Sequence, residues 1–209
     1  MTIEHITNAI NKALANQSDI NTDIYNVRGF STHTMRRLFH ELTNLERCTY
    51  LEVGLYCGAT FVSSFNKCCF SIGIENFSQP FGVESVKEEL EQSVNRFSQA
   101  SGKVQLYDHD CFTFDISKLP PIDIYFFDGE HSEESQAKAL PYYFNSLKPT
   151  FIFIVDDYNW ESVRKGTEKG LAELSDKIEI VKDWKIRGIN AQDDELWHNG
   201  LYIALINKK

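Results

Sequence analysis

The sequence has no run of 18 or more apolar residues and a deficit of basic side chains. Without such a run, no segment has the pattern of a membrane-spanning helix. Lys and Arg number 21 against 30 Asp and Glu, which gives a net charge of −9. Because an acidic surface repels a phosphate backbone, we expect neither nucleic acid nor a membrane as the main partner. The first residues, Met-Thr-Ile-Glu-His, lack the basic and apolar regions of a secretory signal.

The cysteine pattern excludes two further classes of protein. The cysteines are odd in number and include no C-x-x-C pair. This usage argues against a disulfide framework and against a structural zinc site. It suits a reducing compartment, so we expect a cytoplasmic protein in which cysteines are packing residues. The five residues are Cys48, Cys57, Cys68, Cys69 and Cys111.

Apolar spacing divides the chain into an N-terminal helical extension, residues 1–47, and a domain over residues 48–209. Residues 3–15 and 31–46 carry apolar side chains at helical intervals. From Thr49 onward, short apolar runs alternate with helix-like segments, which is typical of βαβ units. A length of 209 residues suits one domain with a small appendage.

The pattern predicts a Rossmann-like, doubly wound α/β fold with a mostly parallel seven-stranded sheet and N-terminal helices. Only a polar loop separates the last two strands, so we expect a hairpin and an antiparallel C-terminal strand. The expected strands cover 49–53, 70–75, 103–107, 122–128, 150–156, 178–184 and 200–207. Besides the two N-terminal helices, the expected helices cover 60–66, 84–99, 133–146 and 160–174.

Residues 50–58, Tyr-Leu-Glu-Val-Gly-Leu-Tyr-Cys-Gly, have the layout of a cofactor-binding loop. A glycine after a strand allows a tight turn and a close approach of the backbone to a ligand. Glu75 ends the next strand, 21 residues after Gly54, where an acid suits the hydroxyls of a ribose. The spacing Gly54-x-x-x-Gly58 differs from the G-x-G-x-x-G of dinucleotide sites. The loop therefore disfavours a nicotinamide dinucleotide without excluding it.

Three acids, Asp128, Asp156 and Asp157, follow the fourth and fifth expected strands, which are neighbours in a doubly wound sheet. Clustered carboxylates are unfavourable unless a cation or a proton compensates them. Mg²⁺ prefers such oxygen ligands and acidifies a bound hydroxyl, which favours a metal site at these three residues. Alternatively, Asp156 or Asp157 caps the following helix. His131 is the candidate general base, unless it merely packs at the start of a helix.

The motifs together resemble class I S-adenosylmethionine-dependent methyltransferases, in particular bacterial and phage enzymes that act on small molecules. The resemblance covers about residues 30–207. It rests on Tyr-Leu-Glu-Val-Gly…Gly-Ala-Thr-Phe, Ile-Glu-Asn-Phe, Phe-Asp-Gly-Glu-His-Ser and Val-Asp-Asp-Tyr. The acids after strands four and five also resemble those of metal-dependent O-methyltransferases of the catechol and sugar types. Asp157 departs from the catechol type, which often has Asn at this position.

The resemblance implies roles for several site residues. Gly54 and Gly58 would flank the methionine part of the cofactor, and Glu52 would lie near its ammonium group. It further implies ribose binding by Glu75 and adenine binding by Asp110, with Cys111 beside the ring. Apart from the resemblance, Asp128 is a candidate for cofactor binding and catalysis, and His131 is a candidate for catalysis.

The expected function is S-adenosylmethionine-dependent O-methylation of a small molecule, with a sugar or phenolic hydroxyl as acceptor and Mg²⁺ as a second cofactor. Two alternatives stay open: an NAD-dependent oxidoreductase, and a non-catalytic nucleotide-binding protein on the same fold. The sequence identifies neither the acceptor nor the oligomeric state, and a homo-oligomer is compatible with it.

Overall fold

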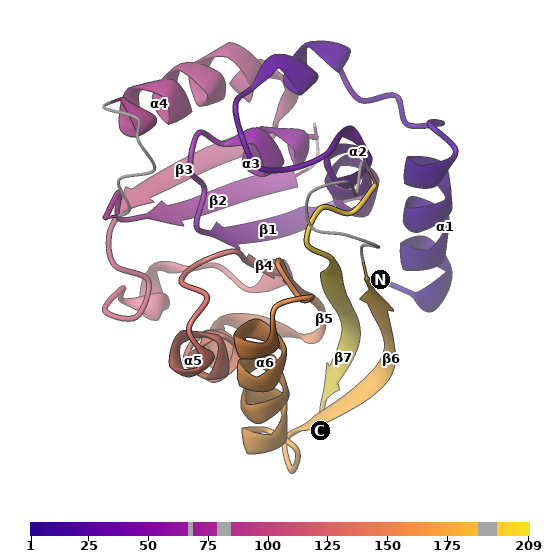
Figure 1. The fold of residues 1–209 in the computed structure, drawn as a ribbon, viewed down its shortest axis with the longest axis vertical. Coiled ribbons are helices and arrows are strands. Elements are labelled where there is room, and N and C mark those ends of the chain that lie inside the picture. Colours follow the sequence, from indigo (N-terminus) through magenta and orange to yellow (C-terminus); the bar gives the residue numbers. More distant parts are fainter. Residues whose placement is uncertain (67–68, 79–84, 188–195) are drawn as a thin grey trace.

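A computed structural model describes residues 1–66, 69–78, 85–187 and 196–209 (Figure 1). Within these residues, seven strands form one sheet in the order β3-β2-β1-β4-β5-β7-β6. β7 runs antiparallel to β5 and β6, and the other neighbouring pairs are parallel. The strands are β1 Cys48–Val53, β2 Cys69–Glu75, β3 Lys103–Asp108, β4 Ile122–Phe127, β5 Leu147–Val155, β6 Ile178–Ile186 and β7 Leu201–Lys208. The predicted fold class is confirmed, including the final hairpin.

Helices cover both faces of the sheet, and Figure 1 shows α1 to α4 on one side and α5 with α6 on the other. The helices are α1 Ile3–Leu14, α2 His33–Thr43, α3 Ala59–Ser63, α4 Val86–Phe97, α5 Glu133–Tyr143 and α6 Glu161–Glu173. Short 3₁₀ turns occur at Thr22–Asn26, Ser98–Ala100, Ile116–Lys118 and Phe144–Ser146. No helix among the described residues has the length and apolarity needed to cross a bilayer.

The N-terminal helices are part of the core on their side of the sheet. Ile6 of α1 and Leu38 of α2 are fully buried in the same apolar cluster as Tyr50 of β1. Phe39 of α2 contacts Phe126 of β4, with ring centroids 4.5 Å apart. Residues 1–47 therefore help to cover one face of the sheet. A doubly wound fold must bury both faces.

The strand boundaries agree with the prediction to within a few residues, and β5 shows the largest difference. It begins at Leu147 instead of residue 150, so Pro149 lies inside the strand. Because proline has no N–H to donate to the ladder, it belongs at irregular positions of a sheet. The β4–β5 pairing is indeed irregular between Ile122 and Ile124, which face this part of β5.

Candidate active site

A cleft opens at the carboxyl ends of the central parallel strands, where open α/β sheets bind ligands. Its cavity volume is about 580 Å³, within the range of small-molecule sites. Eight of the ten predicted site residues line it: Gly54, Glu75, Asp110, Cys111, Asp128, His131, Asp156 and Asp157. Glu52 and Gly58 are the two that do not. The fold thus brings residues from across the sequence to one place.

The loop after β1 is held against the end of β4 by close backbone contact. Gly54 has a φ of +84°, and a Cβ there would lie 2.0 Å from the Asp128 carbonyl oxygen. Its N–H donates to Ile74 O at 3.1 Å, and Asp128 N donates to Val53 O at 2.8 Å. Gly58 begins α3 with a φ of +87°, and a Cβ there would meet the side-chain carbon Leu90 Cδ1 at 2.7 Å. Packing within the protein therefore already requires a glycine at position 54.

Glu75 binds the backbone of the same loop. Its Oε2 accepts hydrogen bonds from Leu55 N at 2.8 Å and Tyr56 N at 3.1 Å. Its Oε1 accepts from Phe77 N at 2.9 Å. The carboxylate lies in the cleft lining and fixes the conformation of the loop around it.

Asp110 and Cys111 form the part of the cleft that follows β3. Asp110 Oδ1 accepts from Phe112 N at 2.9 Å, a local bond that forms a turn after the strand. Burial raises the pKa of the Cys111 thiol to about 12, and the negative charge of Asp110 adds to the effect. Cys111 is therefore a neutral, half-buried wall of the cleft.

Glu52 lies beneath the loop and does not line the cleft. Its side chain is fully buried, where it accepts hydrogen bonds from Tyr50 Oη at 2.6 Å and Thr60 Oγ1 at 2.5 Å. Burial raises its pKa to about 8, although the two hydrogen bonds oppose the shift. Side chains alternate along a strand, so Glu52 points with Tyr50 into the layer that contains α3. The carboxyl group links β1 to the first turn of α3, and its predicted contact with an ammonium group stays a prediction.

Two acids and a histidine meet at the ends of β4 and β5. His131 Nε2 lies 3.0 Å from Asp157 Oδ2 and 3.6 Å from Asp128 Oδ1. The neighbouring Asp156 is 6% exposed, and its N–H donates to Phe127 O at 3.2 Å. The Oδ1 atoms of Asp156 and Asp157 are buried and have no hydrogen-bond partner among the described residues. A buried carboxylate oxygen without a donor is costly unless a proton or a cation compensates it.

The acids raise one another's affinity for protons. Burial raises the pKa of Asp128 well above its ordinary value, and repulsion from Asp157 adds to this. Burial likewise raises the pKa of Asp156, followed by repulsion from Asp128. Clusters of carboxyl groups with perturbed pKa values are a mark of functional sites.

Strained backbone gathers at the cleft. Six non-glycine residues of the described chain have a positive φ, and four of them line the cleft. They are Tyr56, Phe77, Asp157 and His198, with φ between 49° and 53°. Such conformations are unfavourable for residues with a Cβ and persist where the surroundings impose them, often at functional sites.

The structure decides the helix-capping alternatives. Trp160 is the N-cap residue of α6, and no side chain caps that helix, so neither Asp156 nor Asp157 does so. Ser132 caps α5 by accepting from Ser135 N at 3.2 Å, so His131 precedes the helix. The side chains of the acid pair and of His131 are therefore available to the cleft.

Several lining residues were not predicted from the sequence, among them Phe112, Ser135 and Asn199. Asn199 precedes β7, and its carbonyl accepts from Asn159 N at 2.8 Å, which ties this segment to the end of β5. An antiparallel strand begins at the edge where its parallel neighbours end, and this signal would have placed Asn199 at the cleft. Residues 67–68, 79–84 and 188–195 lie outside the described residues, and with them Cys68.

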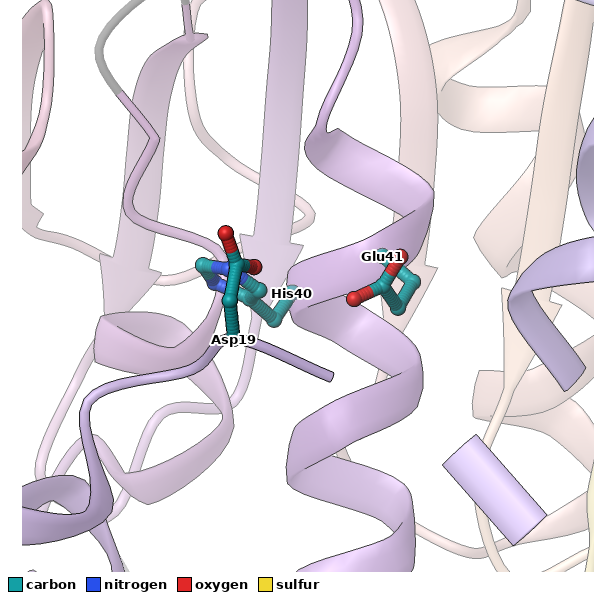
Figure 2. A group of neighbouring side chains, drawn as sticks. All are labelled: Asp19, His40 and Glu41. Carbon is teal, nitrogen blue, oxygen red and sulfur yellow. The ribbon is translucent and has the colours of Figure 1, made fainter. Parts of the chain in front are cut away.

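A second group of side chains with metal-ligand chemistry, Asp19, His40 and Glu41, lies outside the cleft (Figure 2). His40 Nε2 contacts Asp19 Oδ1 at 3.1 Å, and Figure 2 shows these two side chains together. Glu41 instead pairs with Lys12 Nζ at 2.9 Å, and Asp19 is 86% exposed. Since Lys12 already compensates the buried acid, this group needs a cation less than the cleft does.

Known structures share this fold, whereas no protein-family model and no curated protein matches the sequence. An O-methyltransferase from Bacillus cereus in complex with SAH is 10% identical, with a TM-score of 0.60 over 99% of this chain and 92% of its own. The O-methyltransferase TomG from Streptomyces achromogenes, in complex with SAM, is 15% identical (TM-score 0.59, 99% and 91% covered). The SAH-bound methyltransferase PaMTH1 from Podospora anserina is 12% identical (0.59, 100% and 89%). The chain thus has the fold of class I S-adenosylmethionine-dependent methyltransferases.

Replacing Gly54 with Ala should destabilise the protein by about 2–4 kcal/mol, because a Cβ adds strain at positive φ and overlaps the backbone of Asp128. Gly58→Ala is the matched control: it has a similar φ, but its new Cβ meets the movable end of Leu90. We expect a loss of about 1 kcal/mol for the control. Urea unfolding measures both values, and equal losses would contradict the close contact between Gly54 and Asp128.

Replacing Glu52 with Gln should make stability less dependent on pH. The pKa of about 8 lies above the ordinary 4.5, so the folded protein retains a proton that the unfolded chain releases. The stability contributed by Glu52 is therefore lost as pH rises from about 4.5 to about 8. Gln has the shape of the protonated acid but no ionisable group. The free energy of unfolding of the variant, relative to that of the unsubstituted protein, should therefore rise by about 2–4 kcal/mol between pH 5 and pH 8.

Urea unfolding of both proteins at the two pH values measures this difference. The exposed Glu173→Gln on α6 is the control and should follow the unsubstituted protein at both. If the difference in free energy of unfolding between the Glu52→Gln variant and the unsubstituted protein were the same at pH 5 and pH 8, Glu52 would be ionised in the folded protein at both pH values.

Proposed function

We propose that the protein is an S-adenosylmethionine-dependent methyltransferase that methylates a hydroxyl oxygen of a small molecule. The observation that supports this most is the contact of His131 with Asp157 and Asp128, which lies opposite the Gly54 loop in one cleft. The fold, shared with SAH-bound and SAM-bound O-methyltransferases, supports the cofactor. A nicotinamide dinucleotide has no support among these neighbours.

The residues of the cleft divide between cofactor and acceptor. Glu75 and Asp110 would bind the ribose and the adenine, and the backbone of the Gly54 loop would lie along the methionine part. The bound cofactor supplies an electrophilic methyl group on a sulfonium. The cleft would hold the acceptor oxygen in line with that group, and such positioning contributes much of the rate.

His131 would take the proton of the acceptor hydroxyl. Its Nε2 is buried against the two acids, so the lone pair open to the acceptor is that of Nδ1. Asp157 and Asp128 fix the ring and stabilise the imidazolium that forms. The acceptor oxygen would then bond to the methyl carbon as the carbon–sulfur bond breaks and its electron pair stays on sulfur. The proton leaves His131 to solvent.

Asp128, Asp156 and Asp157 would hold a divalent cation such as Mg²⁺. The unpaired Oδ1 atoms of Asp156 and Asp157 fit such an ion, since hard cations prefer carboxylate oxygens. The ion would neutralise the cluster and lower the pKa of a hydroxyl bound to it.

Calorimetric titration with S-adenosylhomocysteine tests the cofactor, and His131→Ala separates catalysis from binding. We expect one-to-one micromolar binding to both proteins, with turnover reduced about 10²-fold or more in the variant. Glu134→Gln, an exposed change on α5, is the control with full turnover. Binding of NADH without S-adenosylhomocysteine would contradict the proposal. Equal turnover of the His131→Ala variant would remove His131 from the mechanism, and the absence of turnover on any acceptor would favour a non-catalytic binding protein.

Millimolar Mg²⁺ should raise the unfolding temperature at pH 8 and have less effect at pH 5. Protons compete with the metal for Asp128 and Asp156, whose pKa values are raised, so binding weakens as pH falls. Differential scanning fluorimetry measures the shift. Asp157→Asn should abolish it, whereas Asp19→Asn, in the group outside the cleft, should retain it. If only the Asp19→Asn variant lost the shift, the ion would bind at Asp19, His40 and Glu41, which would contradict the proposed site.

A further inference from the structure

The charges along the cleft have one sign. Among the described residues that line it, none is Lys or Arg, whereas six are acidic. They are Glu75, Asp110, Asp128, Glu130, Asp156 and Asp157. A concave surface lined by one sign of charge concentrates ligands of the opposite sign and repels those of the same sign.

The acids at the two ends of the cleft differ in their surroundings. Glu75 and Asp110 already accept hydrogen bonds from backbone N–H groups. At the other end, the Oδ1 atoms of Asp156 and Asp157 are buried, less than a tenth of either residue is exposed, and neither atom has a partner in the described chain. The carboxyl oxygens that lack a hydrogen-bond donor are therefore at the acceptor end. A divalent ion would neutralise only two of the four carboxylates there.

Nearby basic side chains are engaged by acids outside the cleft. Lys87 Nζ lies 2.6 Å from Asp108 Oδ2, and Arg28 Nη1 lies 3.2 Å from Glu89 Oε1. Both cations are therefore paired with acids that do not line the cleft.

Two exposed aromatic rings, those of Phe30 and Trp160, line the cleft. Phe30 is 62% exposed and stacks on Tyr56 with a centroid distance of 5.1 Å. Trp160 is 44% exposed and meets the His131 ring edge-on at 4.9 Å. Faces of Trp and Phe bind ammonium groups through cation–π attraction, and they also pack on the flat side of a ring.

We infer that the methyl acceptor is a ring compound that carries a protonated amine beside its hydroxyl groups, and that carboxylated or phosphorylated acceptors are rejected. This inference rests on the proposed function, because it concerns the acceptor end of that site. The amine lies between the carboxylates and the aromatic rings, and the ring packs on Trp160 and Phe30. Charge repulsion excludes an anion of the same shape.

Two sets of matched probes test the charge preference. One is a catechol with an aminoethyl, hydroxyethyl or carboxymethyl chain, and the other is glucosamine, glucose and glucuronate. Binding of each probe is measured by ligand-observed NMR, with Mg²⁺ and with or without S-adenosylhomocysteine. We expect the amine of at least one set to bind at least tenfold more tightly than its carboxylate, with the neutral probe between them. Carboxylate binding equal to or tighter than amine binding, or no amine binding in either set, would overturn the inference.

Glu130, exposed at the cleft, provides a variant that is independent of the buried acids. Glu130→Lys should reduce the amine-to-carboxylate preference at least threefold, whereas Glu134→Lys, in the first turn of α5 and outside the cleft, should leave it unchanged. Equal effects of the two variants would mean that overall charge, and not the cleft, sets the preference. Failure of S-adenosylhomocysteine to bind would count against the proposed function, whereas its binding without an amine preference would count against this inference alone.

Discussion

The backbone contact between Gly54 and Asp128 joins the two halves of the cleft. A side chain at position 54 would overlap the carbonyl of Asp128, and this closeness brings the loop after β1 next to the acids after β4 and β5. Hydrogen bonds from Gly54 N to Ile74 O and from Asp128 N to Val53 O extend the parallel ladder past the strand ends. A ligand bound along the loop would therefore lie next to His131 and the acids.

The cleft gathers groups that are unfavourable to folding. Positive φ angles at Tyr56, Phe77 and Asp157 and carboxyl groups with raised pKa values at Asp128 and Asp156 all destabilise the folded state without a ligand. Two apolar clusters, one on each face of the sheet, supply the compensating stability. A ligand with positive charge at the acceptor end would relieve the repulsion, which couples binding to stability.

Most of the architecture was predictable because each strand is a short apolar run that ends at a polar residue. The ends of β1, β2, β4 and β5 were identified in this way, and with them the acids of the cleft. The environment of Glu52 was not predictable. Alternation shows that Glu52 and Tyr50 share a face, but only the packed structure shows that α3 covers that face and supplies Thr60. Asn199 was missed because its place depends on the antiparallel direction of β7.

A crystal structure of the protein with S-adenosylhomocysteine and Mg²⁺ tests the central claim most directly. The account predicts the ribose at Glu75, the adenine beside Asp110 and Cys111, and the sulfur directed toward Asp128 and His131, with the metal on the acids after β4 and β5. A ligand in the reverse orientation, with its adenine at His131, or a ligand bound outside the cleft would contradict it.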